Sequence, residues 1–158
     1  LPADIAIQWV RAVPAHFHAR YSALARTYRY VILNRPVRSA LDRHRAWQLR
    51  VPIDAAVMQV AASHLIGEHD FSSFRAAGCQ SKNPVRRIEA LEVVRHGEHV
   101  VIEVRANGFL YHMVRNIVGS LVRAGSGEAE PGWLGELLAL RDRRVAAPAV
   151  DAPGGLPG

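Results

Sequence analysis

Cysteine and lysine are almost absent from this chain of 158 residues. Cys79 is the single cysteine, so no disulfide can form within the chain, and such usage is typical of a reducing compartment like the cytosol. Lys82 is the single lysine although the net charge is +6, so arginine carries nearly all of the positive charge. A GC-rich coding bias would explain arginine in place of lysine, but it would not explain the net charge. The charge therefore favours, modestly, an anionic partner such as nucleic acid.

Several functional signatures are also missing. No apolar run is long enough to span a bilayer, so we expect no membrane partner. The eight histidines are not accompanied by cysteines or carboxylates at metal-ligand spacing, so we expect no metal site. Gly125-Ser126-Gly127 is not followed by Gly-Lys-Ser or Gly-Lys-Thr, and Ser72 and Ser73 lack the Gly-x-Ser-x-Gly context. These absences argue against a nucleotide-phosphate loop and a serine nucleophile.

Hydrophobic periodicity predicts an α+β fold with a largely antiparallel, mixed sheet and helices. Alternating patterns predict strands at 5–13, 24–33, 46–51, 88–94 and 100–106, the last two joined by a turn at 96–99. Helical spacing predicts a helix capped by Asp54 and closed by Gly67, and helices at 110–123 and 131–140. We expect one domain over residues 1–147 and a Pro/Gly-rich tail over 148–158 that holds no apolar strand.

Residues 107–119, Asn-Gly-Phe-Leu-Tyr-His-Met-Val-Arg-Asn-Ile-Val-Gly, are the most informative stretch. Its apolar residues form one stripe at helical spacing, and Arg115 lies beside that stripe. A guanidinium does not lose its proton, so it requires a carboxylate or a phosphate as partner. From helix geometry alone, an ordinary surface arginine beside a core helix explains Arg115 equally well.

Three segments of the sequence are considered together: Arg-Thr-Tyr-Arg-Tyr-Val-Ile at 26–32, His-Asp-Phe-Ser-Ser-Phe-Arg at 69–75, and the run at 107–119. Together with Phe-His-Ala-Arg-Tyr-Ser at 17–22, they resemble the TruA family of tRNA pseudouridine synthases. The resemblance covers residues 5–144 and implies a pseudouridine-synthase-like fold, with the helices packed on one face of the sheet.

The resemblance implies an isomerase that converts uridine to pseudouridine in the anticodon stem-loop of tRNA. It also implies a cytoplasmic enzyme without a cofactor that is a homodimer in its full-length form. Tyr28, the first tyrosine of the Tyr-x-Tyr pair, would stack on the target uracil, while Tyr30 would pack in the core. Arg115 would pair with the family's catalytic aspartate.

That aspartate is not found in this sequence. In the family it lies in an Arg-Thr-Asp-x-Gly-Val-His motif, and none of the six aspartates here has that context. We therefore expect the chain to be the carboxy-terminal portion of a longer enzyme, inactive by itself. It would contribute the stacking tyrosine and the arginine that orients the absent acid.

Further arginines are candidate RNA contacts. The set consists of Arg20, Arg26, Arg29, Arg75, Arg86 and Arg87. Each of them taken singly is more typical of a solvated surface arginine, but a basic surface of this kind should contact RNA through some of its members. Two alternatives stay open: a non-catalytic RNA-binding module with the same fold, and an unrelated α+β scaffold whose charge is incidental.

Overall fold

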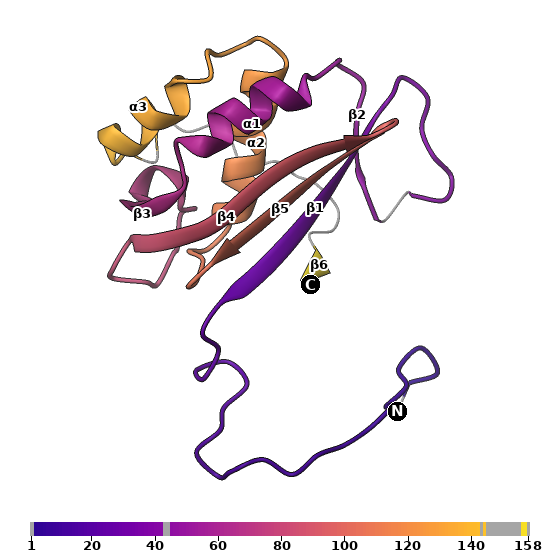
Figure 1. Cartoon of the computed structure of the whole chain (residues 1–158), viewed down its shortest axis with the longest axis vertical. Coiled ribbons are helices and arrows are strands. Elements are labelled where there is room, and N and C mark those ends of the chain that lie inside the picture. The colour runs from indigo at the N-terminus through magenta and orange to yellow at the C-terminus, as the bar shows by residue number, and fades with distance from the viewer. Residues whose placement is uncertain (1, 43–44, 143, 145–155, 158) are drawn as a thin grey trace.

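A six-stranded sheet with helices on one face forms the body of the computed structural model, which describes residues 2–42, 45–142, 144 and 156–157 (Figure 1). The strands are β1 (Arg26–Asn34), β2 (Trp47–Leu49), β3 (Gly67–Asp70), β4 (Val85–His96), β5 (His99–Ala106) and β6 (Leu156–Pro157). The helices are α1 (Ala55–Ser63), the 3-10 helix η1 (Ser72–Phe74), α2 (Met113–Gly125) and α3 (Trp133–Leu140).

The sheet is mixed and largely antiparallel, as expected. Its order is β2-β1-β5-β4-β3, and β6 pairs with β1. Only the β1–β2 pair is parallel among the strands described. The predicted α+β class, with helices on one face, is therefore confirmed.

The central hairpin follows directly from the sequence pattern. In β5, Val100, Ile102, Val104 and Ala106 are all buried, because side chains of a strand alternate between its two faces. Gly97 adopts a positive φ of 59° in the turn that joins β4 to β5, a conformation that glycine adopts without steric cost. The predicted turn at 96–99 is confirmed.

Helix α2 supplies the centre of the core. Met113, Ile117 and Leu121 are fully buried, and they pack with residues of the sheet and of α1. The helix begins at Met113, three residues later than predicted. The reason is the backbone of His112, whose φ of 56° is left-handed and cannot continue a right-handed helix.

Helix α1 differs from the prediction at its end. Asp54 caps it, because its side chain accepts hydrogen bonds from the backbone N–H groups of Ala56 and Val57. The helix nevertheless ends at Ser63, and Gly67 begins β3 instead of closing the helix. The sequence did not predict β3, which is only four residues long.

Two further expectations at the ends of the chain are wrong. Residues 5–13 form no strand; they run through an exposed arm in which Trp9 is 77% and Val10 85% exposed (Figure 1). Alternation is not sufficient for a strand, because the backbone groups also need a pairing partner. Conversely, the Pro/Gly-rich stretch does contain a strand, since β6 pairs Leu156 and Pro157 with Arg29 and Tyr28 of β1.

Candidate functional site

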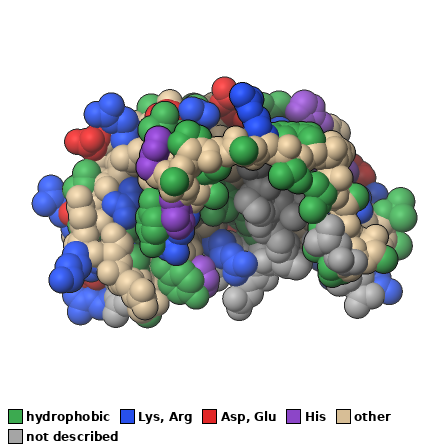
Figure 2. All heavy atoms as spheres, turned by 90° about the horizontal axis from the view of Figure 1, so that it is seen from below, with side chains coloured by type: hydrophobic (Ala, Val, Ile, Leu, Met, Phe, Trp, Pro, Cys, Tyr) green, Lys and Arg blue, Asp and Glu red, His purple; other side chains and the backbone are tan. Residues whose placement is uncertain are grey.

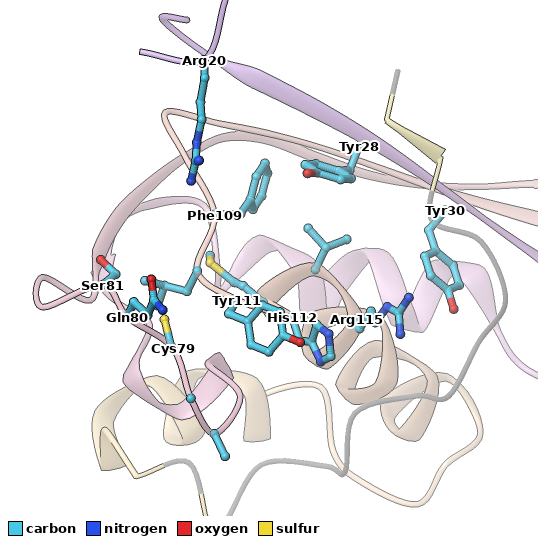
Figure 3. A pocket seen from close by; sticks show the side chains of 15 residues that line it. Arg20, Tyr28, Tyr30, Cys79, Gln80, Ser81, Phe109, Tyr111, His112 and Arg115 are labelled. Atoms are coloured by element: carbon cyan, nitrogen blue, oxygen red, sulfur yellow. The ribbon is translucent and has the colours of Figure 1, made fainter.

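An open pocket of about 910 Å³ lies between β1, the loop that follows η1, and the segment that leads into α2 (Figure 3). This volume falls within the range of about 300–1,000 Å³ that is typical of small-molecule sites. Tyr28, Tyr30 and Arg115 all line it, although β1 and α2 are far apart in the sequence. The two residues on which the sequence interpretation depends most, Tyr28 and Arg115, therefore share one pocket.

Tyr28 forms part of the pocket wall and is held by its neighbours. Its backbone pairs with Val104 in the centre of the sheet, which is a rigid support. Its ring meets the ring of Phe109 edge-to-face, with the centroids 5.0 Å apart. The ring is only partly buried, so one side of it is open to the pocket (Figure 3). A planar aromatic group could stack there.

Arg115 lies in the first turn of α2, at the end of the pocket where Tyr30 also lies (Figure 3). Within the described part of the chain, no carboxylate forms an ion pair with it. The amino-terminal end of a helix also carries partial positive charge. This end of the pocket therefore favours an anion, such as a carboxylate or a phosphate.

The hydroxyl of Tyr30 is the second notable group at this end. Tyr30 is only 2% exposed, and its hydroxyl has no hydrogen-bond partner among the described residues. Burial raises the pKa of Tyr30 to about 12, although the nearby Arg115 guanidinium acts in the opposite direction. The phenol is therefore a neutral hydrogen-bond donor next to a fixed cation. The sequence assigned Tyr30 to the core only, and the core position is confirmed.

Two hydrogen bonds, one of them buried, hold the start of α2 and with it Arg115. The side-chain Nδ2 of Asn116 donates to the Phe74 carbonyl at 2.7 Å, which ties α2 to η1. The backbone N–H of Ala76 donates to the Tyr111 carbonyl at 3.0 Å, which ties the following loop to the start of the helix. Arg115 thus projects from a helix whose first turn cannot easily shift.

The loop over residues 77–81 lines the opposite end of the pocket (Figure 3). Burial acts to raise the pKa of the Cys79 thiol, but hydrogen bonds from backbone groups of Tyr111 and Ser81, with the charges of Arg75 and Arg86, leave it below its ordinary value. Sequence reasoning did not place Cys79 in a site, because no basic residue is adjacent to it in the sequence; Arg75 and Arg86 lie four residues before it and seven residues after it. Tyr111 and His112, whose rings stack at 4.0 Å, were also missed, although they lie within the 107–119 run.

The six candidate RNA-binding arginines divide into two groups. Four of them lie at or near the pocket. Arg20 lines the pocket, and Arg26 donates from Nη2 to the Arg20 carbonyl at 2.8 Å. The charges of Arg75 and Arg86 act to lower the pKa of the Cys79 thiol, which also lines the pocket.

The other two form ion pairs away from the pocket, Arg29 with Glu103 at 2.9 Å and Arg87 with Glu68 at 3.5 Å. Arg29 alternates with Tyr28 and Tyr30 along β1, so its side chain lies on the other face of the sheet. Figure 2 shows Arg and Lys side chains gathered at one side of a hollowed face of the molecule.

The described residues include no group of three or more histidine, cysteine, aspartate or glutamate side chains that could hold a metal ion. Likewise, none of the helices in this part of the chain is long and apolar enough to cross a membrane.

Comparison with known proteins gives one consistent result. The family model described as tRNA pseudouridine synthase matches residues 61–156. The protein named tRNA pseudouridine synthase A from Methylococcus capsulatus is 54% identical over 153 residues, which cover 97% of this chain and 56% of the relative. Its namesake from Klebsiella pneumoniae is 51% identical over 98% of this chain and 57% of the relative. That from Albidiferax ferrireducens is 49% identical over 98% of this chain and 59% of the relative. The chain thus spans little more than half the length of these relatives.

Proposed function

This chain belongs to the tRNA pseudouridine synthase family, and from that premise we propose that the full-length protein isomerises uridine to pseudouridine in tRNA. The reaction breaks the N-glycosidic bond, turns the uracil, and joins its carbon to the same sugar. It consumes no electron carrier, so the proposal includes no cofactor. The observation that carries it is the shared pocket of Tyr28 and Arg115.

We propose that Tyr28 receives the target base. A base in a stem must leave its stack before chemistry, which costs a few kcal/mol. Stacking on an aromatic side chain returns about 1–3 kcal/mol per base. The partly open Tyr28 ring, held by Phe109, has the geometry for this contact.

We further propose that Arg115 pairs with a catalytic aspartate supplied by a part of the full-length protein outside these 158 residues. The absence of an acidic partner among the described residues supports this assignment. An arginine beside a carboxylate lowers the carboxyl pKa and keeps it ionised. The 158 residues alone would then be inactive.

The substrate that we propose is the anticodon stem-loop of tRNA, modified in the cytoplasm by a homodimer of the full-length protein. Arg20, Arg26, Arg75 and Arg86 would contact the RNA near the pocket, because they gather there. Arg29 and Arg87 would contact the RNA only if a phosphate replaced the carboxylates with which they now pair, so their role in RNA binding remains a prediction. RNA recognition of this kind depends on shape and phosphate contacts.

Incubation of the full-length protein with unmodified tRNA, followed by chromatography of the nucleosides, tests the proposal. We expect pseudouridine to form, and Tyr28→Ala to lower kcat/KM by about 5- to 150-fold because the stacking energy is lost. Tyr28→Phe keeps the ring and should stay near wild type. Salt-sensitive RNA binding without pseudouridine would favour the non-catalytic module, and absent or salt-independent binding would favour an incidental charge.

A further inference from the structure

Gly108 lies between two guanidinium groups that come from different strands. A Cβ atom built on Gly108 would be 3.5 Å from Nη1 of Arg26 and 3.6 Å from Nε of Arg86. Both nitrogens are therefore close to one point, and they are at most about 7 Å apart. Gly108 is buried and places no side chain at this point between the two nitrogens, which we call the gap.

Both guanidiniums are held in place by neutral acceptors. Arg26 donates from Nη2 to the Arg20 carbonyl at 2.8 Å. Arg86 donates from Nη1 to the Asn83 carbonyl at 2.9 Å and from Nη2 to Oγ of Ser81 at 3.0 Å. These bonds orient the side chains, and they leave Nη1 of Arg26 and Nε of Arg86 beside the gap.

No carboxylate offsets the two charges within the described part of the chain. Neither Arg26 nor Arg86 forms an ion pair there, whereas Arg29, Arg87 and Arg105 all do. Two cations fixed this close together repel one another, and an anion between them removes the repulsion. Because charge-assisted N–H···O bonds are about 2.7–2.9 Å long, two oxygens of one phosphate can reach both nitrogens.

The gap adjoins the pocket. Residue 108 directly precedes Phe109, whose ring contacts Tyr28, and both Arg20 and Ser81 line the pocket as well as holding the two guanidiniums. An anion at Gly108 would thus lie just outside the space in which an extruded base would stack. The backbone of a nucleic acid carries a phosphate next to every base.

We propose that Arg26 and Arg86 clamp one backbone phosphate of the RNA over Gly108, next to the nucleotide whose base enters the pocket. This rests on the proposed function, because it requires RNA as substrate. Gly108 would form the floor of the clamp, because no side chain at residue 108 fills the point that lies near both guanidinium nitrogens.

The first test measures the salt dependence of binding between the full-length protein and an unmodified anticodon stem-loop RNA. Arg26→Gln and Arg86→Gln should each reduce the slope of log affinity against log salt by about 0.7–0.9, the value for one phosphate contact. The reduction of this slope in the double variant should be smaller than the sum of the reductions in the two single variants, because both side chains hold the same phosphate. The matched control is Arg105→Gln, an exposed arginine paired with Glu89 at 2.7 Å, which should leave the slope unchanged.

Gly108→Ala tests the clamp without changing any charge. The methyl group fits, because contacts of 3.5–3.6 Å are ordinary, and it would occupy the gap between the guanidiniums. We expect weaker RNA binding with an unchanged melting temperature. Gly132→Ala, where a Cβ atom would meet nothing within 4 Å, is the control and should bind as the wild type does.

Stem-loop RNAs with a single uncharged methylphosphonate linkage locate the phosphate. One linkage beside the target uridine should weaken binding to the wild type, and the same linkage should have no further effect on the Arg26→Gln, Arg86→Gln double variant. The clamp is refuted if no linkage loses its effect in that variant, or if the arginine variants match Arg105→Gln. A wild-type protein that neither binds nor modifies the RNA would instead refute the proposed function.

Discussion

Replacing Arg115 with glutamine should move the acid limb of the pH–rate profile of the full-length enzyme. Glutamine keeps much of the length of the side chain and removes its charge. Arg115 lies in the first turn of α2, which is anchored through Asn116 to η1, so the substitution should leave the surrounding backbone in place. The tRNA affinity should change little, because Arg115 is proposed to face the catalytic carboxylate.

The size of the shift follows from the position of the side chain. An arginine next to a carboxylate lowers the carboxyl pKa by about 1–3 units. Arg115 is only partly buried and its pocket is open to solvent, so screening favours the lower part of that range, about 1–2 units. Removing the guanidinium raises the carboxyl pKa, so activity should be lost at a pH about 1–2 units higher than in the wild type. This corresponds to about 1.4–2.7 kcal/mol.

The assay is pseudouridine formation on unmodified tRNA, with kcat/KM measured as a function of pH. A range of about pH 4 to pH 8 covers the values over which a perturbed carboxyl group titrates. At neutral pH the carboxylate should remain ionised in both proteins, so any loss there measures orientation of the acid and not its charge. Arg115→Lys retains the charge and should keep the acid limb near that of the wild type, although turnover falls because lysine lacks the planar fork. An unchanged acid limb in Arg115→Gln would refute the pairing.

Three further substitutions test the scaffold by urea denaturation. Tyr30→Phe should leave the free energy of unfolding unchanged or slightly higher, because the buried hydroxyl lacks a partner among the described residues; a loss above about 1 kcal/mol would contradict this. Gly125→Ala should lower the free energy of unfolding by about 1–2 kcal/mol, because the new Cβ would be only 2.6 Å from Cγ of Met58. This overpacking should outweigh the gain in helix propensity, and wild-type stability would contradict the prediction. Asn116→Ala should cost about 1–3 kcal/mol by leaving the Phe74 carbonyl unpaired in the core, and a neutral result would show that the carbonyl finds another donor.

Local patterns in the sequence were sufficient to predict the helices and strands whose own residues show clear periodicity, a helix cap or a turn glycine. The β4–β5 hairpin was predicted from alternation and from the glycine in its turn, and α1 was predicted from its aspartate cap and its apolar stripe. Residues 5–13 carry the alternation of a strand but pair with nothing described, while β3 and β6 pair although their sequences carry almost no strand signal. Pairing joins distant segments, so a local pattern cannot decide it.

The sequence by itself determined the family, the α+β class and the two residues most worth testing, Tyr28 and Arg115, because these depend on motifs and on periodicity. Only the tertiary structure decided that the two line one pocket, that the Tyr30 hydroxyl lies near the guanidinium, and which arginines are already paired. Arg29 illustrates the reason: its partner Glu103 is 74 residues away along the chain. Charge composition counts arginines, but whether each is free to bind an anion depends on which carboxylate the fold places beside it.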